Sequence, residues 1–341
     1  MPRKKELLSQ WLNRAGVLRA SLALRGPHSQ RLHVLAYHRV FEVNDEDRFP
    51  CDPELVSASP QEFALQMAFV KEHFHVLRLS ELVQIVERRE SLPPRSLLIT
   101  FDDGHLDNYT HAYPILRSLG LPAAIFLSTG YVGMQGQFWF DRIATLLYYA
   151  PPGWHRVPGL ESEIHVGDIV SRRAATEQVL GHAKRLPNAR RLALVQTLER
   201  QLAPHVPSGS DLPSAALSWD QVREMAAGGI EFGSHCVTHP IMSTLDDESL
   251  RFEMAHSRET IRSETGQAAD VIAYPVGREY AFDQRVAPLA RSCGYHLGFS
   301  YVAGVDRLDT LDPFAIRRIE VERYIPFHFF VARLAMPELF L

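Results

Sequence analysis

The chain has 341 residues, of which 46% are hydrophobic and 22% charged, a balance typical of a globular protein with a sizeable core. Its formal net charge of -4 at pH 7 argues against a nucleic-acid-binding protein, because such proteins gather Lys and Arg into basic patches. The three cysteines lack the C-x-x-C spacing of zinc ribbons and redox motifs, so we expect a fold that does not rely on disulfides.

Residues 1–30 predict a basic amphipathic helix, with an apolar pattern interrupted by polar residues. The pattern provides no signal-peptide core, and no later stretch approaches the ~20 apolar residues of a transmembrane helix. We therefore expect a protein that is cytoplasmic or peripheral on the inner membrane, with membrane contact through this helix. The alternative is a helix that packs on the domain.

Short apolar runs, each followed by a helix-like stretch, indicate parallel strands joined by crossover helices. Seven runs have this character: 32–37, 96–101, 123–127, 230–233, 271–274, 296–300 and 314–319. Seven strands of this kind predict a barrel.

Helix boundaries are marked by capping signals. Ser59 with Glu62, and Ser218 with Gln221, form capping boxes, and the second helix is expected to stop at Gly228-Gly229 in a left-handed conformation. A third helix is predicted over about 247–264, ending at Gly266.

Residues 134–217 depart from the alternating pattern. A Pro-rich patch leads into a basic helical pair around 172–202, which we interpret as a helical insertion over one barrel face. The insertion is either a lid over the substrate or a structural decoration. Tyr131, Phe138, Trp139 and Phe140 precede the helical pair, and such a cluster is either a stacking surface for sugar rings or the root of the insertion.

Two adjacent carboxylates, Asp102 and Asp103, end the buried run at 96–101 and are followed by Gly104. The carboxyl ends of strands line the active site in parallel α/β folds, so these acids are expected on the functional face. The alternative is an ordinary surface turn.

His235 and His239 follow another predicted strand, at a spacing that places two imidazoles on one face of a helical turn. With one carboxylate they would make a three-ligand metal site with a position left for water. A zincin peptidase needs Glu directly after the first His, and Cys236 stands there, so the general base must come from elsewhere. Asp102 is the available carboxylate.

Four segments occur in a distinctive order: Leu35-Ala36-Tyr37-His38-Arg39-Val40, Thr100-Phe101-Asp102-Asp103-Gly104, His235-Cys236-Val237-Thr238-His239 and Ala273-Tyr274-Pro275-Val276-Gly277. Together they resemble the polysaccharide deacetylase family with the NodB homology domain, and the first and last are similar to its poly-N-acetylglucosamine deacetylase branch. The similarity extends over about residues 32–325. It implies a deformed (β/α)7 barrel and an enzyme that uses a divalent metal to remove N-acetyl groups from amino sugars of a polysaccharide or its precursor.

The resemblance also implies a role for each matching residue. Asp103, His235 and His239 would be metal ligands, Asp102 the general base and His38 the general acid. A second reading of His38 is a histidine hydrogen-bonded beneath the barrel mouth. The metal is expected to be Zn²⁺, with Co²⁺, Ni²⁺ or Mn²⁺ as alternatives. Tyr274, Pro275 and Val276 are expected to bind substrate, with the Val276 N–H facing the oxyanion.

Two departures from the family pattern keep a rival function open. Cys236 replaces the usual Ser or Thr and would offer a soft metal ligand, and the arginine that many members carry early in the third motif is missing from residues 269–274. The rival is a non-catalytic glycan-binding or assembly component of a polysaccharide export system.

The expected organisation follows from these assignments. Residues 1–30 form the amphipathic segment, 31–133 and 218–325 the barrel, 134–217 the insertion, and 326–341 a C-terminal tail. The expected partners are an N-acetylated glycan and a membrane surface, with no nucleic acid.

Overall fold

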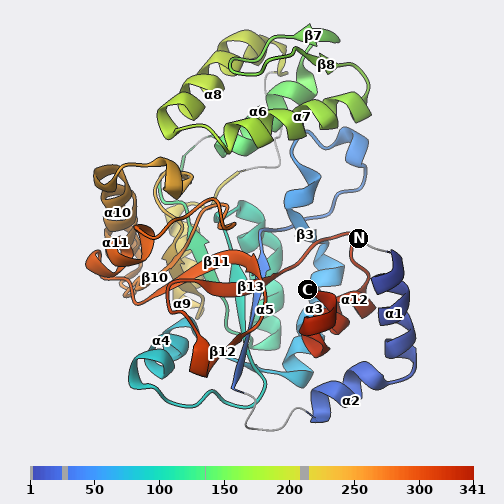
Figure 1. The fold of residues 1–341 in the computed structure, drawn as a ribbon, viewed down its shortest axis with the longest axis vertical. Helices are drawn as coiled ribbons and strands as arrows, with labels where there is room; N and C mark the ends of the chain where they lie inside the picture. Colours follow the sequence, from blue (N-terminus) through green and yellow to red (C-terminus); the bar gives the residue numbers. More distant parts are fainter. Residues whose placement is uncertain (1–2, 25–29, 135, 208–214) are drawn as a thin grey trace.

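The computed structural model describes residues 3–24, 30–134, 136–207 and 215–341 (Figure 1). Within these residues, seven parallel strands close into a barrel, because β1 pairs with both β13 and β5. In spatial order the strands are β1 (Arg31–Tyr37), β13 (Ile316–Glu320), β11 (Leu297–Ala303), β10 (Val271–Ala273), β9 (Glu231–Ser234), β6 (Ala124–Leu127) and β5 (Ser96–Phe101). The predicted (β/α)7 barrel is confirmed.

The barrel strands are buried along almost their whole length, as expected of parallel strands covered on both faces. All seven apolar runs form strands, although β11 extends further than predicted, to Ala303. Four shorter strands flank the barrel: β4 (His75–Val76) and β12 (Asp306–Arg307) at its edges, and β2 (Arg39–Val40) paired with β3 (Val56–Ala58).

Helices surround the barrel. They are α3 (Pro60–His73), α4 (Leu79–Arg88), α5 (Tyr113–Leu119), preceded by a π-helical turn at Asn108–Ala112, α9 (Trp219–Ala227), α10 (Asp247–Thr265) and α11 (Val286–Ser292). The three whose starts were predicted, α3, α9 and α10, begin where the sequence indicates. Both capping boxes form, at Ser59 and at Ser218. Only the second glycine of the predicted left-handed stop has positive φ: Gly229 has φ +95°, whereas Gly228 has φ -81°.

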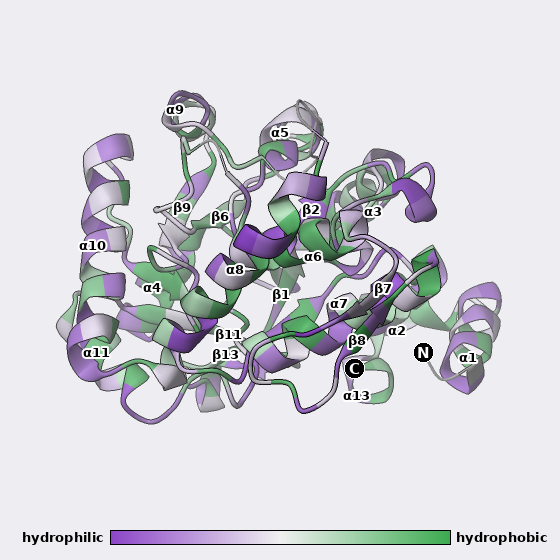
Figure 2. Cartoon of the chain, turned by 90° about the horizontal axis from the view of Figure 1, so that it is seen from above, coloured by the Kyte–Doolittle hydropathy of each residue, from purple (hydrophilic) through white to green (hydrophobic). Residues whose placement is uncertain are grey.

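The insertion forms a second layer over one end of the barrel (Figure 1). It contains α6 (Trp139–Tyr149), the hairpin β7 (Gly153–His155) and β8 (Ile164–Val166), α7 (Ile169–Ala183) and α8 (Asn188–Leu202). Its apolar residues form a hydrophobic cluster of their own. Helix α6 is mostly hydrophobic, whereas α10 on the outside of the barrel is mostly hydrophilic (Figure 2). The hairpin was not predicted.

The two ends of the chain pack together beside the barrel. Helices α1 (Arg3–Arg14) and α2 (Val17–Leu24) contact α12 (Phe327–Ala335), which is followed by α13 (Pro337–Phe340). Leu18, Leu22 and Phe329 belong to the main apolar cluster, so the segment predicted as a tail is a packed helical element. Among the described residues, no helix combines the length and apolarity needed to cross a membrane.

Candidate active site

The carboxyl ends of β5 and β9 bring three residues together: Asp103, His235 and His239. The Nε2 atoms of His235 and His239 lie 3.5 and 3.2 Å from Oδ1 of Asp103. One ligand atom from each residue lies within 4.8 Å of the others, and all three side chains are buried. The sequence motifs therefore converge as predicted.

Tight backbone turns, rather than a helix, aim these side chains. Asp103 has φ +71° and Gly104 has φ +87°, and a Cβ added at Gly104 would lie 2.6 Å from Leu127 Cδ2. The helical turn expected at the histidine pair is wrong, because the residues after β9 form an irregular loop in which Cys236 and His239 have positive φ. Left-handed residues reverse the chain, so both imidazoles still reach Asp103.

The chemistry of this group fits a divalent cation. The carbonyl oxygen of Ala273 can only accept, so at 2.8 Å Nδ1 of His235 carries the proton and Nε2 presents its lone pair to the site. Burial lowers the pKa of His235 to about 4, which keeps the ring neutral. Oδ1 of Asp103 is buried with no hydrogen-bond partner among the described residues, and a bound cation would satisfy it.

Asp102 lies beside this group and is held by Arg318 of β13. The two Nη atoms donate to the two carboxylate oxygens at 2.8 and 2.7 Å, and Nε of Arg318 donates to the Ser300 carbonyl at 2.7 Å. Burial alone would raise the pKa of Asp102, but Arg318, together with His235 and His38, holds the pKa below its ordinary value. Arg318 therefore supplies the cation missing from the third motif.

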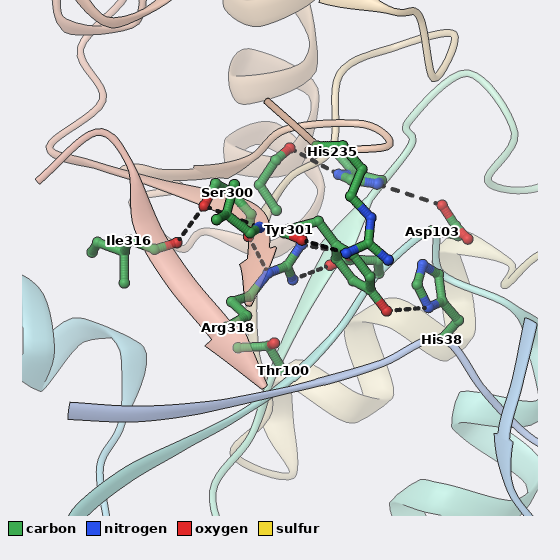
Figure 3. Close-up of polar contacts among 12 residues, drawn as sticks. His38, Thr100, Asp103, His235, Ser300, Tyr301, Ile316 and Arg318 are labelled. Atoms are coloured by element: carbon green, nitrogen blue, oxygen red, sulfur yellow. Dashed lines mark hydrogen bonds and ion pairs between the residues drawn. The ribbon is translucent and has the colours of Figure 1, made fainter. Parts of the chain in front are cut away.

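His38 follows β1 and lies at the same mouth of the barrel. Its Nδ1 is 3.4 Å from the hydroxyl of Tyr301, and the side chain is half-buried (Figure 3). Its backbone is fixed on both sides, since Ser57 Oγ accepts from its N–H and its carbonyl accepts from Asn108. The imidazole thus has a defined position beside Asp102 while remaining accessible.

A cavity of about 240 Å³ opens over these residues. Its floor includes His38, Asp102, Asp103 and His239, and the insertion contributes part of the wall. The wall residues from the insertion and from the segment before β3 are Trp139, Phe140, Leu180, Lys184, Asp52, Glu54 and Leu55. Of the predicted aromatic cluster, Trp139 and Phe140 line the cavity as well as the insertion core, whereas Phe138 is fully buried.

The residues expected to bind substrate lie in different environments. Val276 lines the cavity and has φ +62°. Tyr274 is buried, and its hydroxyl donates to the Phe314 carbonyl at 2.7 Å, so its side chain supports the turn from below. Pro275 is buried beside it. Substrate contact by this motif stays a prediction, and Val276 is the residue placed to make it.

Cys236 is not part of the ligand group. Its side chain is buried in an apolar cluster with Met242 and Tyr295, and burial raises the pKa of the thiol. The histidine loop is instead held by Glu253 of α10, whose carboxylate accepts from the Val237 and Thr238 N–H groups at 2.7 and 2.9 Å. The expectation of a soft sulfur ligand is therefore wrong.

The fold and this site define a barrel hydrolase with a buried Asp-His-His group that could hold a metal ion. The polysaccharide deacetylase family model matches residues 89–298, more than half of the chain, and the chain belongs to this family. It is accordingly an enzyme, a polysaccharide deacetylase, and metal dependence is typical of the family.

Relatives of several kinds agree with this assignment. The Bacillus subtilis protein YxkH is 21% identical over 292 residues, 85% of this chain and 71% of YxkH. The poly-beta-1,6-N-acetyl-D-glucosamine N-deacetylase of Staphylococcus aureus is 33% identical over 117 residues, which cover 32% of this chain and 40% of that protein. The structure of Streptococcus pyogenes deacetylase PplD in complex with acetate matches with a TM-score of 0.58 at 20% identity, over 88% of this chain and 95% of that chain, so the two share a fold.

Proposed function

We propose that this enzyme removes N-acetyl groups from amino sugars of a polysaccharide or its precursor. The observation that carries the proposal is Oδ1 of Asp103, a buried oxygen without a hydrogen-bond partner that faces two imidazole nitrogens and lies beside the Arg318-bound Asp102. The substrate class is supported by the likeness to the Staphylococcus aureus N-deacetylase.

Asp103, His235 and His239 would hold the cation. Two imidazole nitrogens and one carboxylate oxygen suit Zn²⁺, and Co²⁺, Ni²⁺ or Mn²⁺ accept the same donors. When bound, the cation would supply a Lewis acid that polarises the acyl carbonyl and lowers the pKa of water toward ~7.

Asp102 is placed to act as the general base. Arg318 keeps the carboxylate ionised and fixes its orientation, so it can accept the proton of a water that attacks the acetamide carbon. The backbone N–H of Val276 is the proposed partner of the developing oxyanion, because Val276 lines the cavity on a left-handed turn.

His38 is the proposed general acid. Its ring lies at the cavity, where it can protonate the sugar nitrogen as the C–N bond breaks, and Tyr301 orients the ring from the other side. The tetrahedral centre then collapses to acetate and a free amino sugar.

Acetate release from N-acetylglucosamine oligomers tests the proposal. We expect release by the purified protein, loss after dialysis against a chelator, and recovery when Zn²⁺ or Co²⁺ is added. A metal-replete protein that binds these oligomers but releases no acetate would instead support the non-catalytic glycan-binding component, for which no observation in the site argues directly.

We also propose that α1 contacts an anionic membrane surface. Leu7, Leu8 and Trp11 share one face of the helix and are 58%, 43% and 64% exposed, with exposed Lys4 and Arg14 at its two ends. Leucine and tryptophan side chains bordered by cations suit the interface of an anionic bilayer.

Flotation with vesicles of phosphatidylcholine, with and without phosphatidylglycerol, tests this surface. We expect binding only to the anionic vesicles, and its loss in the Leu7→Ser/Trp11→Ser variant. The control Leu65→Ser removes an equally exposed leucine from α3 and should bind as the wild type does. Equal flotation of all three proteins would refute membrane contact through α1, and so would a wild type that does not float with anionic vesicles.

A further inference from the structure

Helix α6 of the insertion begins in direct contact with the histidines of the site. The indole N–H of Trp139 donates to the His239 carbonyl at 3.1 Å, and the ring of Phe140 packs against the His239 ring at a centroid distance of 5.1 Å. The ring of Phe138 lies 4.7 Å from that of His105. The insertion therefore supports the site as well as lining the cavity.

His105 is a fully buried histidine that the proposed mechanism does not use. Its Nε2 lies 3.4 Å from Oδ2 of Asp103, whereas His235 and His239 approach the other oxygen, Oδ1. It is not in the ligand group that the described residues form, which comprises Asp103, His235 and His239. The two oxygens of Asp103 thus have different neighbours, one facing the ligand histidines and the other facing His105.

The backbone around His105 is fixed by the chain that leaves the insertion. Leu106 N–H donates to the Ala215 carbonyl at 2.8 Å, and Leu217 N–H donates to the Gly104 carbonyl at 2.9 Å. These bonds hold the turn from Gly104 to Leu106 on both sides. The imidazole therefore meets Asp103 from a rigid segment and not from a free loop.

Asp141 of α6 places a second carboxylate in this region. It is fully buried, neither of its oxygens has a hydrogen-bond partner among the described residues, and burial raises its pKa to about 6 although the nearby His105 acts to lower it. The insertion thus places a buried carboxylate within electrostatic reach of His105.

We propose that His105 is a positioning residue that holds Oδ2 of Asp103, so that this carboxylate binds a cation through Oδ1 alone, and that α6 keeps His105 in place. A carboxylate can bind a metal through one oxygen or both, and a partner on the outer oxygen selects the first mode and orients the ligand. Single-oxygen binding leaves more of the coordination sphere open to water and substrate. The inference rests on the metal site of the proposed function.

Metal affinity of the purified apoprotein tests the inference, measured by competition with a chromophoric zinc chelator. We expect His105→Phe to weaken Zn²⁺ binding about 10- to 100-fold, the usual effect of losing such an outer partner. His105→Gln keeps an N–H donor and should recover most of the affinity. His33→Phe replaces another buried histidine, at the start of β1, and should leave the affinity unchanged.

Two further readouts separate positioning from other roles. The visible spectrum of the Co²⁺-loaded His105→Phe protein should show the wild-type number of nitrogen ligands, and thermal unfolding of the apoprotein should match that of His33→Phe. Wild-type affinity in His105→Phe, or loss of a nitrogen ligand from its spectrum, would overturn the inference while the proposed function stood. A wild-type protein without any metal affinity would instead overturn the proposed function.

Discussion

The two Nη atoms of Arg318 donate hydrogen bonds to the two carboxylate oxygens of Asp102, at 2.8 and 2.7 Å, and both side chains are fully buried. Arg318 lies on β13, two strands along the barrel from β5, which Asp102 follows. A guanidinium fits a carboxylate through two parallel hydrogen bonds, which an ammonium cannot reproduce. The pair therefore fixes the direction of the base as well as its charge.

Arg318→Lys should lower kcat by at least about 10-fold with little change in KM, because general base catalysis is worth 10²- to 10⁴-fold and depends on orientation. Arg318 lowers the pKa of Asp102, so a weaker cation lets that pKa rise and the acid limb of the kcat/KM profile moves to higher pH. Arg317→Lys, at the neighbouring residue paired with Asp306, should leave both rate and profile unchanged. If the acid limb of Arg318→Lys stays at the wild-type pH, Arg318 does not set the pKa of the catalytic base.

Asp102→Asn removes the base and keeps the shape of the side chain. We expect turnover to fall about 10²- to 10⁴-fold while Zn²⁺ content stays near that of the wild type, because Asp103, and not Asp102, belongs to the ligand group. Acetate release measures the turnover, and metal analysis of the same sample measures the Zn²⁺ content. Turnover equal to that of the wild type would reject Asp102 as the base, and loss of the metal would make it a ligand.

The sequence predicts the ligand group because its residues lie in two compact motifs directly after buried strands. Arg318 lacks such a signal: it lies 216 residues from Asp102, on a strand whose pattern indicates only burial. Glu253 is likewise one acid among several on α10, and only the packing of that helix brings it to the Val237 and Thr238 amides. Local sequence motifs identify the residues at the end of a single strand. The contacts of Arg318 and Glu253 depend instead on how distant strands and helices pack when the barrel closes.

The spacing of His235 and His239 shows a second limit of prediction from the sequence. A four-residue interval predicts a shared face only if the segment is helical, and here the segment is a loop with left-handed residues at Cys236 and His239. The ligands still converge, because the loop is anchored by Glu253 and by the Trp139 contact to His239. The convergence was predicted correctly and its backbone geometry was not.

Glu253→Gln should loosen the histidine loop. One oxygen of Glu253 accepts from two backbone N–H groups and the other from the Thr238 hydroxyl, and an amide nitrogen cannot accept in their place. We expect weaker Zn²⁺ binding, by about 10-fold or more, as for other losses of an outer support. Glu259→Gln changes an exposed acid on the same helix and should bind Zn²⁺ as the wild type does. Equal Zn²⁺ affinity in Glu253→Gln and Glu259→Gln would contradict a role of Glu253 in supporting the histidine loop.

His38→Gln should reduce N-deacetylation strongly and hydrolysis of 4-nitrophenyl acetate much less. A sugar amine leaves only when protonated, whereas nitrophenolate leaves without an acid, and general acid catalysis contributes about 10²- to 10⁴-fold to the former. The ratio of the two rates is the measurement, since a structural defect would lower both alike. Tyr301→Phe, which removes the hydroxyl near Nδ1, should lower the ratio by a smaller factor. If His38→Gln loses activity on both substrates by the same factor, His38 is not the general acid. That result would favour the alternative, a structural histidine hydrogen-bonded beneath the barrel mouth.

The raised pKa of the buried Asp141 carboxyl lets us predict how the stability of the metal-free protein depends on pH. Burial raises its pKa to about 6, above the ~3.9 of an unfolded chain. Between these values the folded state keeps a proton that the unfolded state has released, so the free energy of unfolding falls as pH rises from about 4 to about 6 and then levels off. At ~1.4 kcal/mol per pKa unit, the loss is at most about 3 kcal/mol.

Asp141→Asn cannot ionise and should lack this loss. In urea unfolding at pH 4, 5, 6 and 7, we expect the variant to gain on the wild type as pH rises to 6, with no further gain at pH 7. Asp246→Asn should behave in the opposite sense, because the N–H of Ser249 at the start of α10 holds the pKa of Asp246 below its ordinary value, so that wild-type advantage grows as pH rises through the acid range. Parallel pH profiles for Asp141→Asn and the wild type would mean that this carboxyl ionises in the folded protein as it does in the unfolded chain, and that burial does not raise its pKa.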